Sequence, residues 1–397
     1  MNHPFNLQDE LVLIQDNNLY RHRQVLDSPQ GIEIESAGKH YLNFSSNDYL
    51  GLANHPDLIA GFRTAVDRYG VGSGAAHLVC GHSAAHHALE EELADWLGRE
   101  RALLFSTGYM ANLGVISALL GKTDAVFEDR LNHASLLDGG LLSGARFQRF
   151  QHADSNDLQR RLEKSSAQRK LIVTDGVFSM DGDLAPLQTL ATCAHDTNAW
   201  LMVDDAHGIG VLGANGQGSL QVAGLNQSQV PVLMGTLGKA LGTFGAFVAG
   251  SEDLIEFLIQ RARTYIYTTA MPAAVAEATR ASLQLVQSDD WRRQKLVNLV
   301  KRFQHGLIQL GIQPVATTTP IQPILLGDSQ RAIQVSDGLK QRGFWVTAIR
   351  PPTVATGTAR LRVTLCASHQ EVHVDRLLDA LDQSMKESQS SFNHIDR

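Results

Sequence analysis

An aspartate, a histidine and a lysine follow apolar segments in the middle of the chain. Asp204 and His207 come directly after the apolar run at residues 199–203, and Lys239 lies on a glycine-containing turn after another apolar run. These residue types suit pyridoxal 5′-phosphate. A carboxylate keeps the ring nitrogen protonated, an imidazole donates to the ring hydroxyl, and a lysine amine bonds covalently to the aldehyde. The three residues therefore predict a site for this cofactor.

Other residues that suit the cofactor lie at the starts of helices or after strands. Ser-Thr-Gly-Tyr at residues 106–109 is a small-residue turn at an expected helix start, where free N–H groups and the helix dipole favour a phosphate. Thr236 adds a hydroxyl for the same anion, Ser179 could reach the ring, and His133 could lie flat against it. Each residue alone is commonly structural. Together they indicate one site, because ligands of open α/β folds bind at the carboxyl ends of strands.

Short apolar runs alternate with longer stretches of helical period, and these elements would position the candidate residues. The alternation is typical of βαβ units and predicts an α/β fold with a mostly parallel sheet. Strands are expected at residues 102–105, 125–128, 170–174, 200–204, 232–235 and 245–249. Helices are expected at 83–97, with Ser83 as the N-cap, and at 108–120, 253–263 and 273–287.

A charged stretch at residues 288–293 indicates a domain boundary in this chain of 397 residues, which is long enough for two domains. We expect an N-terminal arm at residues 1–45, a large cofactor-binding domain at 46–287 and a small C-terminal α+β domain at 288–397. The small domain is expected to contain helices at 295–310, 330–342 and 370–385 and strands at 321–326, 345–349 and 360–365.

Composition excludes several classes of protein. Lys and Arg total 34 against 41 Asp and Glu, so the net charge of −7 gives no basic footprint for nucleic acid or an anionic membrane. The three cysteines are too few and too dispersed for a disulfide framework, and no run of 18 apolar residues or apolar leader occurs. We therefore expect a cytoplasmic protein. The spacing of the histidines along the sequence indicates no metal site.

Two nucleotide-binding motifs occur without the context that they need. Residues 208–213 read Gly-Ile-Gly-Val-Leu-Gly, but the following residues make a poor helix, and no acidic residue stands between there and Ser251 to hold a ribose hydroxyl. Gly-Lys-Thr at residues 121–123 is similar to the end of a P-loop, but Ile116 replaces the first glycine. Both nucleotide hypotheses are therefore rejected.

Eight segments, in order along nearly the whole chain, resemble those of the α-oxoamine synthases. They are residues 45–52, 105–112, 129–135, 175–183, 204–208, 236–242, 265–269 and 351–362. The resemblance implies a fold-type I transferase dependent on pyridoxal phosphate, with a seven-stranded, mostly parallel sheet and a smaller C-terminal α+β domain. It also implies a homodimer whose active sites are shared between the subunits.

The resemblance implies a decarboxylative condensation in biotin synthesis. L-alanine would react with a pimeloyl thioester of CoA or acyl carrier protein, and carbon dioxide and the free thiol would leave. One alternative is another α-oxoamine synthase, such as 2-amino-3-ketobutyrate CoA ligase. A fold-type I aminotransferase is a second alternative, and it would need an arginine-rich pocket for a second carboxylate. A non-catalytic binding role is disfavoured, because Lys239 occurs with its full set of partners.

The same resemblance assigns roles at the cofactor. Lys239 would bond to the cofactor and then take the proton from the alanine Cα, Asp204 would pair with the ring nitrogen, and His133 would stack on the ring. His207 would tune the ring oxygen together with Ser179. The phosphate would be held by Gly108, Tyr109, Thr236 and Thr268 of the partner subunit.

The resemblance also implies residues for the substrates. Arg350 would bind the substrate carboxylate through its planar guanidinium. Arg21 and Thr353 would lie toward the acyl substrate, and Asn47, together with His133, would shape the pocket beside the substrate.

Several residues depart from the family pattern. Residues 72–77 read Gly-Ser-Gly-Ala-Ala-His, so a glycine and a hydroxyl of the usual loop are replaced by two alanines. Cys80 and His82 stand where serine and tyrosine are common, Ala355 replaces a proline, and Asp175 replaces a frequent glutamate. None of these departures changes the lysine, aspartate or histidine expected at the cofactor.

Overall fold

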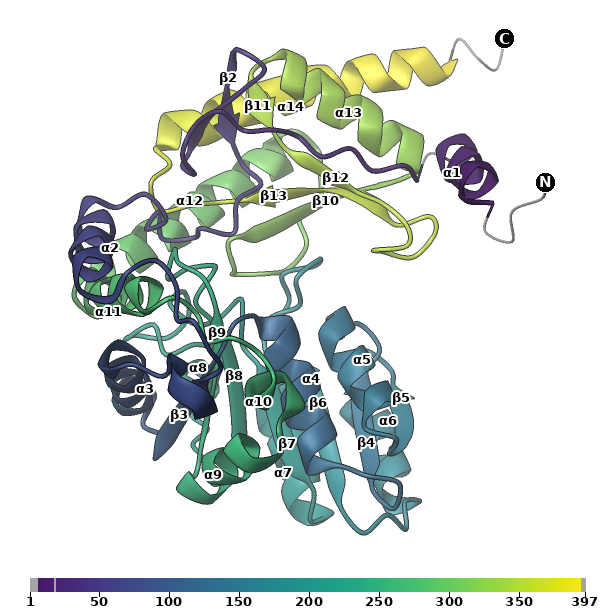
Figure 1. The fold of residues 1–397 in the computed structure, drawn as a ribbon. Helices are drawn as coiled ribbons and strands as arrows, with labels where there is room; N and C mark the ends of the chain where they lie inside the picture. Colours follow the sequence, from purple (N-terminus) through teal and green to yellow (C-terminus); the bar gives the residue numbers. More distant parts are fainter. Residues whose placement is uncertain (1–5, 18, 394–397) are drawn as a thin grey trace. The chain divides into compact units, whose positions relative to one another are not determined.

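The computed structural model describes residues 6–17 and 19–393, and the contacts divide the chain into two compact units (Figure 1). One unit is Asn47–Gln294. The other combines Met1–Ser46 with Lys295–Arg397. Helix α12 (Asp290–Gln309) begins inside the charged stretch at residues 288–293, so it starts earlier than the expected residue 295. Among the described residues, no helix is long and apolar enough to cross a membrane.

The larger unit holds a seven-stranded sheet in the order β3-β9-β8-β7-β6-β4-β5. Strand β9 runs antiparallel to β3 and β8, and the other neighbouring pairs are parallel. The α/β fold with a mostly parallel sheet is thus confirmed. The strands are β3 (Arg101–Phe105), β4 (Ala125–Asp129), β5 (Arg146–Phe150), β6 (Lys170–Asp175), β7 (Trp200–Asp204), β8 (Val232–Thr236) and β9 (Ala246–Gly250).

Strand β5 was not predicted, because its Arg-Phe-Gln-Arg-Phe sequence lacks the continuous apolar run of the other strands. Strand β5 needs fewer apolar residues than the inner strands because it lies at the edge of the sheet, where Phe150 is its one buried residue. The six predicted strands lie inward of β5 or at the opposite edge and are largely buried. Periodicity therefore found the strands that helices cover on both faces.

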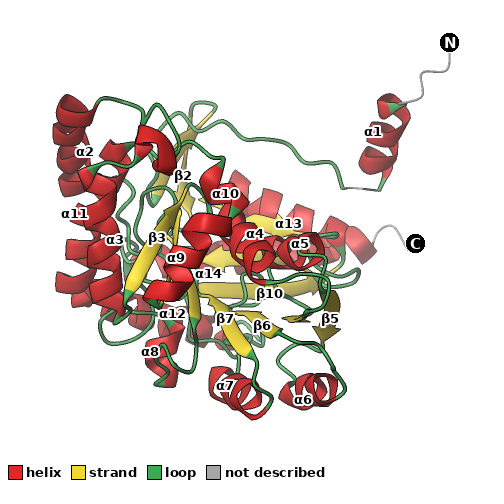
Figure 2. Cartoon of the chain, turned by 60° about the horizontal axis from the view of Figure 1, so that its bottom comes forward, coloured by secondary structure: helices red, strands yellow, loops and turns green. Residues whose placement is uncertain are grey.

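Helices pack on both faces of this sheet (Figure 2). Alternate strand residues point to opposite faces, so Val126 and Met202 join one apolar cluster while Phe127 and Val203 join the other. The first cluster includes residues of α4 (Gly108–Leu119), α5 (Ala134–Leu142), α9 (Glu252–Arg261) and α10 (Arg263–Ile266). The second includes residues of α6 (Ser155–Glu163), α7 (Leu187–Asp196) and α8 (Ser219–Ala223).

Two further helices of the larger unit, α2 (Pro56–Tyr69) and α3 (Ala84–Leu97), each pack against α11 (Ala273–Ser288). Ser83 is the N-cap of α3, as predicted, and a short π-helical turn, η1 (His77–Gly81), precedes it.

The smaller unit contains two three-stranded sheets. Strands β1 (Glu33–Ser36) and β2 (Lys39–Asn43) form one sheet with β11 (Phe344–Trp345). Strands β10 (Ile321–Gly327), β13 (Ala359–Thr364) and β12 (Thr347–Ile349) form the other. The helices are α1 (Leu7–Asp16), most of α12, α13 (Ser329–Gln341) and α14 (Glu371–Asn393).

The prediction of one strand at residues 345–349 is wrong. The segment divides at Val346, because β11 pairs with β2 while β12 pairs with β13. The carbonyl of Val346 accepts a hydrogen bond from the Ser336 hydroxyl at 2.6 Å, which satisfies it outside either sheet. A single apolar run therefore serves two sheets, and its periodicity does not reveal the change of partner.

Candidate active site

A cavity of about 190 Å³ lies in the larger unit, where strands β6, β7 and β8 end. Asp175, Asp204 and Thr236 are the last residues of these three strands, and all three line the cavity. The structure thus brings seven predicted residues to one site. The full lining is Gly108, Tyr109, Asn112, His133, Ser135, Asp175, Asp204, Ala206, His207, Met234, Thr236 and Lys239.

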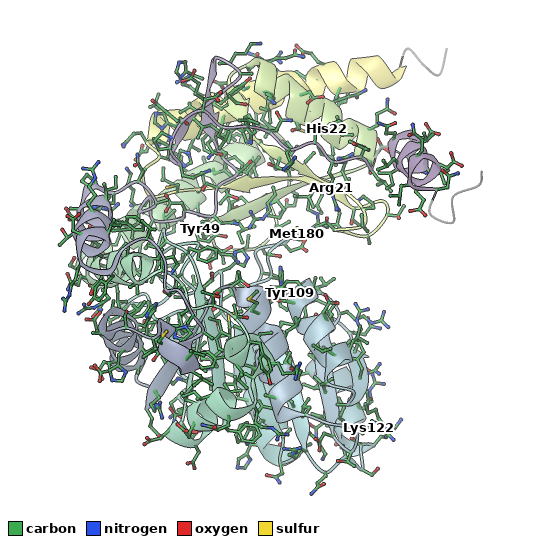
Figure 3. All side chains as sticks on the ribbon, viewed as in Figure 1. Arg21, His22, Tyr49, Tyr109, Lys122 and Met180 are labelled. Atoms are coloured by element: carbon green, nitrogen blue, oxygen red, sulfur yellow. The ribbon has the colours of Figure 1, made fainter. Side chains whose placement is uncertain are left out.

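Figure 3 labels Tyr109 and Lys122 at opposite ends of the segment that contains α4. Tyr109 lies in the first turn of this helix and lines the cavity. Lys122 follows the helix and is exposed. The Gly-Lys-Thr segment therefore lies away from the cavity, which agrees with the rejection of a P-loop.

Lys239 begins a chain of polar contacts that leads out of the cavity. Its Nζ lies 2.7 Å from Nε2 of His207, and Nδ1 of His207 lies 2.5 Å from the hydroxyl of Tyr49. That hydroxyl donates to Oδ1 of Asn47 at 3.3 Å. The directions fit one tautomer: Nε2 of His207 accepts from the lysine, and Nδ1–H donates to Tyr49. His207 therefore positions the lysine amine, and Asn47 joins the site through Tyr49.

Asp204 is buried and held by two N–H donors. Nδ2 of Asn112 donates to Asp204 Oδ2 at 2.7 Å, and the backbone N–H of Ala206 donates to Oδ1 at 3.0 Å. Hydrogen bonds of this kind favour the ionised carboxylate and fix its direction. The same Nδ2 also donates to Ser135 Oγ at 2.9 Å. Asn112 therefore orients the carboxylate that would face a ring nitrogen.

Asp175 is the residue of β6 that pairs with Asp204 of β7. Burial, and then the charge of Asp204, raise the pKa of Asp175 well above its usual range. The raised pKa favours the protonated form of Asp175, and its Oδ2 accepts the backbone N–H of His133 at 2.7 Å. Of the two carboxyl groups at the strand ends, Asp204 is held by Asn112 and the Ala206 N–H, and Asp175 anchors His133.

The imidazole of His133 is neutral at neutral pH, because burial lowers its pKa. Its Nδ1 lies 2.7 Å from Ser135 Oγ, which fixes the ring. The ring of Tyr109 meets it edge-on at 6.4 Å between centroids. A flat, uncharged ring held in this way suits stacking on an aromatic ligand.

The start of α4 supplies the anion-binding end of the cavity. Thr107 is the N-cap, and its Oγ1 accepts from the Met110 N–H at 3.1 Å, while Gly108 and Tyr109, which line the cavity, carry the first amides of the helix. The Tyr109 hydroxyl donates to Asp138. Thr236 Oγ1 donates to the Gly245 carbonyl at 3.0 Å, so its proton must turn before it can serve a phosphate.

Other predicted residues lie outside the lining of this cavity. Ser179 is in the turn that follows β6, and Thr268 is in the loop between α10 and α11. Arg21, labelled in Figure 3, belongs to the smaller unit, where its Nη2 donates to Thr353 Oγ1 at 3.4 Å. The backbone N–H of Thr353 donates to the carbonyl of Arg350 at 3.1 Å. The structure thus brings the predicted substrate residues Arg21, Thr353 and Arg350 together.

Sequence reasoning missed six residues at this site, namely Tyr49, Asn112, Ser135, Asp175, Ala206 and Met234. Asn112 could have been found, since it lies four residues after Gly108 on the same face of a predicted helix. Asp175 directly follows the strand predicted at residues 170–174, and the sequence indicates it only as a departure from the family pattern. Tyr49 gives no local signal, because its contact with His207 spans 158 residues.

His152 holds the loop that follows β6. Its Nε2 lies 2.8 Å from Asp183 Oδ2, its Nδ1 lies 3.0 Å from Asp129 Oδ1, and its ring meets Phe178 edge-on at 4.4 Å. Burial alone would lower the pKa of His152. The hydrogen bonds to Asp129 and Asp183 outweigh this effect and raise the pKa to about 10. His152 is therefore an imidazolium at neutral pH and joins two carboxylates.

Replacing His152 with glutamine is expected to destabilise the protein by roughly 2 kcal/mol at pH 6.5, the scale of hydrogen bonds to charged groups. The folded pKa exceeds the unfolded value near 6.5, so the stabilisation is complete below about pH 6.5 and is lost as pH rises toward 10. The difference in thermal midpoint between wild type and His152→Gln should thus shrink between pH 6.5 and 9.5. The exposed His195, as His195→Gln, is the control. An equal difference at both pH values would contradict a charged His152.

Comparisons with known proteins agree with this site. A family model described as aminotransferase class I and II matches residues 39–381. The 8-amino-7-oxononanoate synthase of Methylococcus capsulatus is 62% identical over 377 residues, which are 95% of this chain and 97% of that protein. The synthase of the same name from Nitrosococcus oceani is 63% identical over 374 residues, 94% and 99% of the two chains. A solved serine palmitoyltransferase from S. paucimobilis with bound pyridoxal phosphate has a TM-score of 0.91 and 30% identity, covering 97% of this chain and 98% of that one.

The residues present fit pyridoxal 5′-phosphate. The Lys239 amine, the Asp204 carboxyl group and a helix start meet in one cavity, and Oδ1 of Asn112 is a buried acceptor without a hydrogen-bond partner among the described residues. Fold and site together define a fold-type I transferase that depends on pyridoxal phosphate, and its class is that of the α-oxoamine synthases. The chain belongs to the family of the 8-amino-7-oxononanoate synthases.

Proposed function

We propose that this enzyme condenses L-alanine with a pimeloyl thioester, giving 8-amino-7-oxononanoate, carbon dioxide and the free thiol. The observation that carries the proposal is the convergence of the Lys239 amine and the Asp204 carboxylate in one cavity at the strand ends. The high identity to the 8-amino-7-oxononanoate synthases over nearly the full chain supports this choice of substrates.

The chain's own residues divide the work as follows. Bound pyridoxal phosphate supplies an electron sink for the negative charge that develops at the alanine Cα. Asp204 holds a proton on the ring nitrogen, and His133 covers one face of the ring. Lys239 holds the cofactor and then takes and returns the proton at Cα, while His207 and Ser179 hold the ring oxygen. The phosphate lies at Gly108, Tyr109 and Thr236, with Thr268 of the partner subunit.

The substrate residues belong to the same proposal. Arg350 binds the substrate carboxylate, Arg21 and Thr353 lie along the acyl chain or its carrier, and Asn47 shapes the pocket through Tyr49. The contact of Arg21 with Thr353 supports the grouping of these two residues. The proposed enzyme has an arm at residues 1–45, a cofactor domain at 46–287 and a small domain at 288–397. It acts in the cytoplasm as a homodimer whose active sites are shared between the subunits.

A matrix of amino acids and acyl thioesters, scored by release of free thiol, tests the substrates. Alanine, glycine and serine are each combined with pimeloyl-CoA, pimeloyl-acyl carrier protein and acetyl-CoA. We expect thiol release only with alanine and a pimeloyl donor, and the two pimeloyl columns identify the carrier. Activity confined to glycine with acetyl-CoA would assign the chain to ketobutyrate ligase chemistry. Transfer of nitrogen to an oxo acid without thiol release would indicate an aminotransferase.

A further inference from the structure

Four histidines gather around the start of α3, apart from the cofactor cavity. His77 lies in η1, His82 precedes the N-cap Ser83, and His86 and His87 lie in the first turn of α3. Glu90 follows one turn later, on the helix face that it shares with His86 and His87. The proposed reaction uses none of these side chains.

Three of these side chains present donor atoms to one point. One ligand atom from each of His82, His87 and Glu90 lies within 4.8 Å of the others. Nε2 of His82 lies 3.9 Å from Glu90 Oε2, and the rings of His82 and His87 are 5.8 Å apart at 83°. Ligands bound tetrahedrally at 2.0–2.2 Å from zinc lie about 3.4 Å apart, so the His82 and Glu90 atoms need to approach by roughly 0.5 Å and no pair by more than roughly 1.4 Å.

Neighbouring groups orient two of the three donors. Nδ1 of His82 lies 2.9 Å from Nδ1 of His77, which leaves Nε2 of His82 directed at Glu90. Oε1 of Glu90 accepts the backbone N–H of Leu104 at 2.9 Å, which leaves Oε2 directed at His82. Hydrogen bonds from outer groups that fix ligand directions are typical of metal sites.

The third donor supplies the adjustment that binding needs. The His87 side chain is 65% exposed and contacts only the equally exposed Glu91, at 3.4 Å, among its ion pairs. Rotation of His87 away from Glu91 costs little, because exposed ion pairs contribute little to stability. The exposed side also leaves room for a water ligand. His86 is not a ligand, since its Nε2 lies 2.7 Å from the Met271 carbonyl and its Nδ1 bonds to Ser83.

We propose that His82, His87 and Glu90 bind a divalent cation of the zinc type, with water as the fourth ligand. Two imidazoles and one carboxylate are ligands that favour Zn²⁺ over the oxygen-preferring Mg²⁺ and Ca²⁺. The ion would tie the segment before Ser83 to α3. Spacing along the sequence hides it, because one ligand comes from a loop and two come from a helix.

The test is titration of the holoenzyme with zinc chloride, followed by calorimetry and by the thermal midpoint. We expect one Zn²⁺ per chain and a rise in the thermal midpoint, because a ligand that binds only the folded state stabilises it. Magnesium chloride should give neither effect. The variant His82→Tyr/His87→Gln should fold with the wild-type midpoint in chelator and lose both zinc effects. His195→Gln, which removes an exposed histidine elsewhere, should keep them.

Two results would overturn the site. The first is no stoichiometric zinc binding by the wild-type holoenzyme. The second is binding that survives in the double variant, because zinc would then occupy other groups, such as Cys80 or the cofactor cavity. The thiol-release activity of the double variant without added metal should equal that of the wild type. Zinc binding therefore tests the metal site, and thiol release tests the proposed reaction separately.

Discussion

Lys239→Ala is expected to lower the rate of thiol release from alanine and pimeloyl-CoA by roughly 10³-fold or more. Lys239 supplies the one amine among the residues that line the described cavity, and it would serve both as the covalent link and as the base. Loss of a positioned proton-transfer group alone typically costs 10²–10⁴-fold. Steady-state kinetics measure the loss, and the visible absorbance of a lysine-bound cofactor should also disappear.

Lys122→Ala is the matched control for this experiment. Lys122 is exposed and follows α4 at the end away from the cavity, so its removal should leave both rate and absorbance unchanged (Figure 3). Added methylamine should restore part of the activity of Lys239→Ala, because a small free amine can enter the space left by the side chain. Activity of Lys239→Ala within tenfold of wild type would refute the role assigned to this lysine.

Asp204→Asn is expected to lower kcat by roughly 10²–10³-fold, the scale of losing one preorganised electrostatic partner. The asparagine has the same shape and can still accept one of the two N–H groups, from Asn112 or Ala206, that hold the carboxylate. It cannot hold a proton on the ring nitrogen. Affinity for pyridoxal phosphate, measured by titration of absorbance, should change much less, because the proposal gives the phosphate to Gly108, Tyr109 and Thr236.

Asp175→Asn is the matched control, since Asp175 lines the same cavity at the end of the adjacent strand. Its raised pKa favours the neutral form, and an asparagine oxygen can still accept the His133 N–H. We expect the loss to stay below about tenfold. Equal losses in the two variants would show that Asp175 shares the negative charge. Near-wild-type turnover of Asp204→Asn would refute the pairing of Asp204 with the ring nitrogen.

Local patterns were sufficient to predict which strands carry the chemistry. The apolar runs that end at Asp204 and near Thr236 are short and bounded, so their ends could be located from the sequence. Because the carboxyl ends of parallel strands meet at one edge of a sheet, the residues there were expected to converge. The resemblance to a known family then supplied the individual roles. Strand ends and resemblance together are therefore enough to predict Lys239, Asp204, His207 and His133 from the sequence.

Long-range packing set what periodicity does not encode. The contacts of Tyr49 with His207 and of Asn112 with Asp204 join residues 158 and 92 positions apart, and both depend on how separate elements dock. The division of residues 345–349 between two sheets likewise follows from the strands that happen to lie beside them.

The charge states at the site follow the same rule. Asp175 and Asp204 are the same residue type, yet burial and the charge of Asp204 raise the pKa of Asp175, while Asn112 and the Ala206 N–H hold the carboxyl group of Asp204. The sequence specified the residue types and the strand ends that carry them, since both are local properties. Folding specified which groups touch, which are buried and which keep a proton, since burial and contact arise only when distant segments pack together.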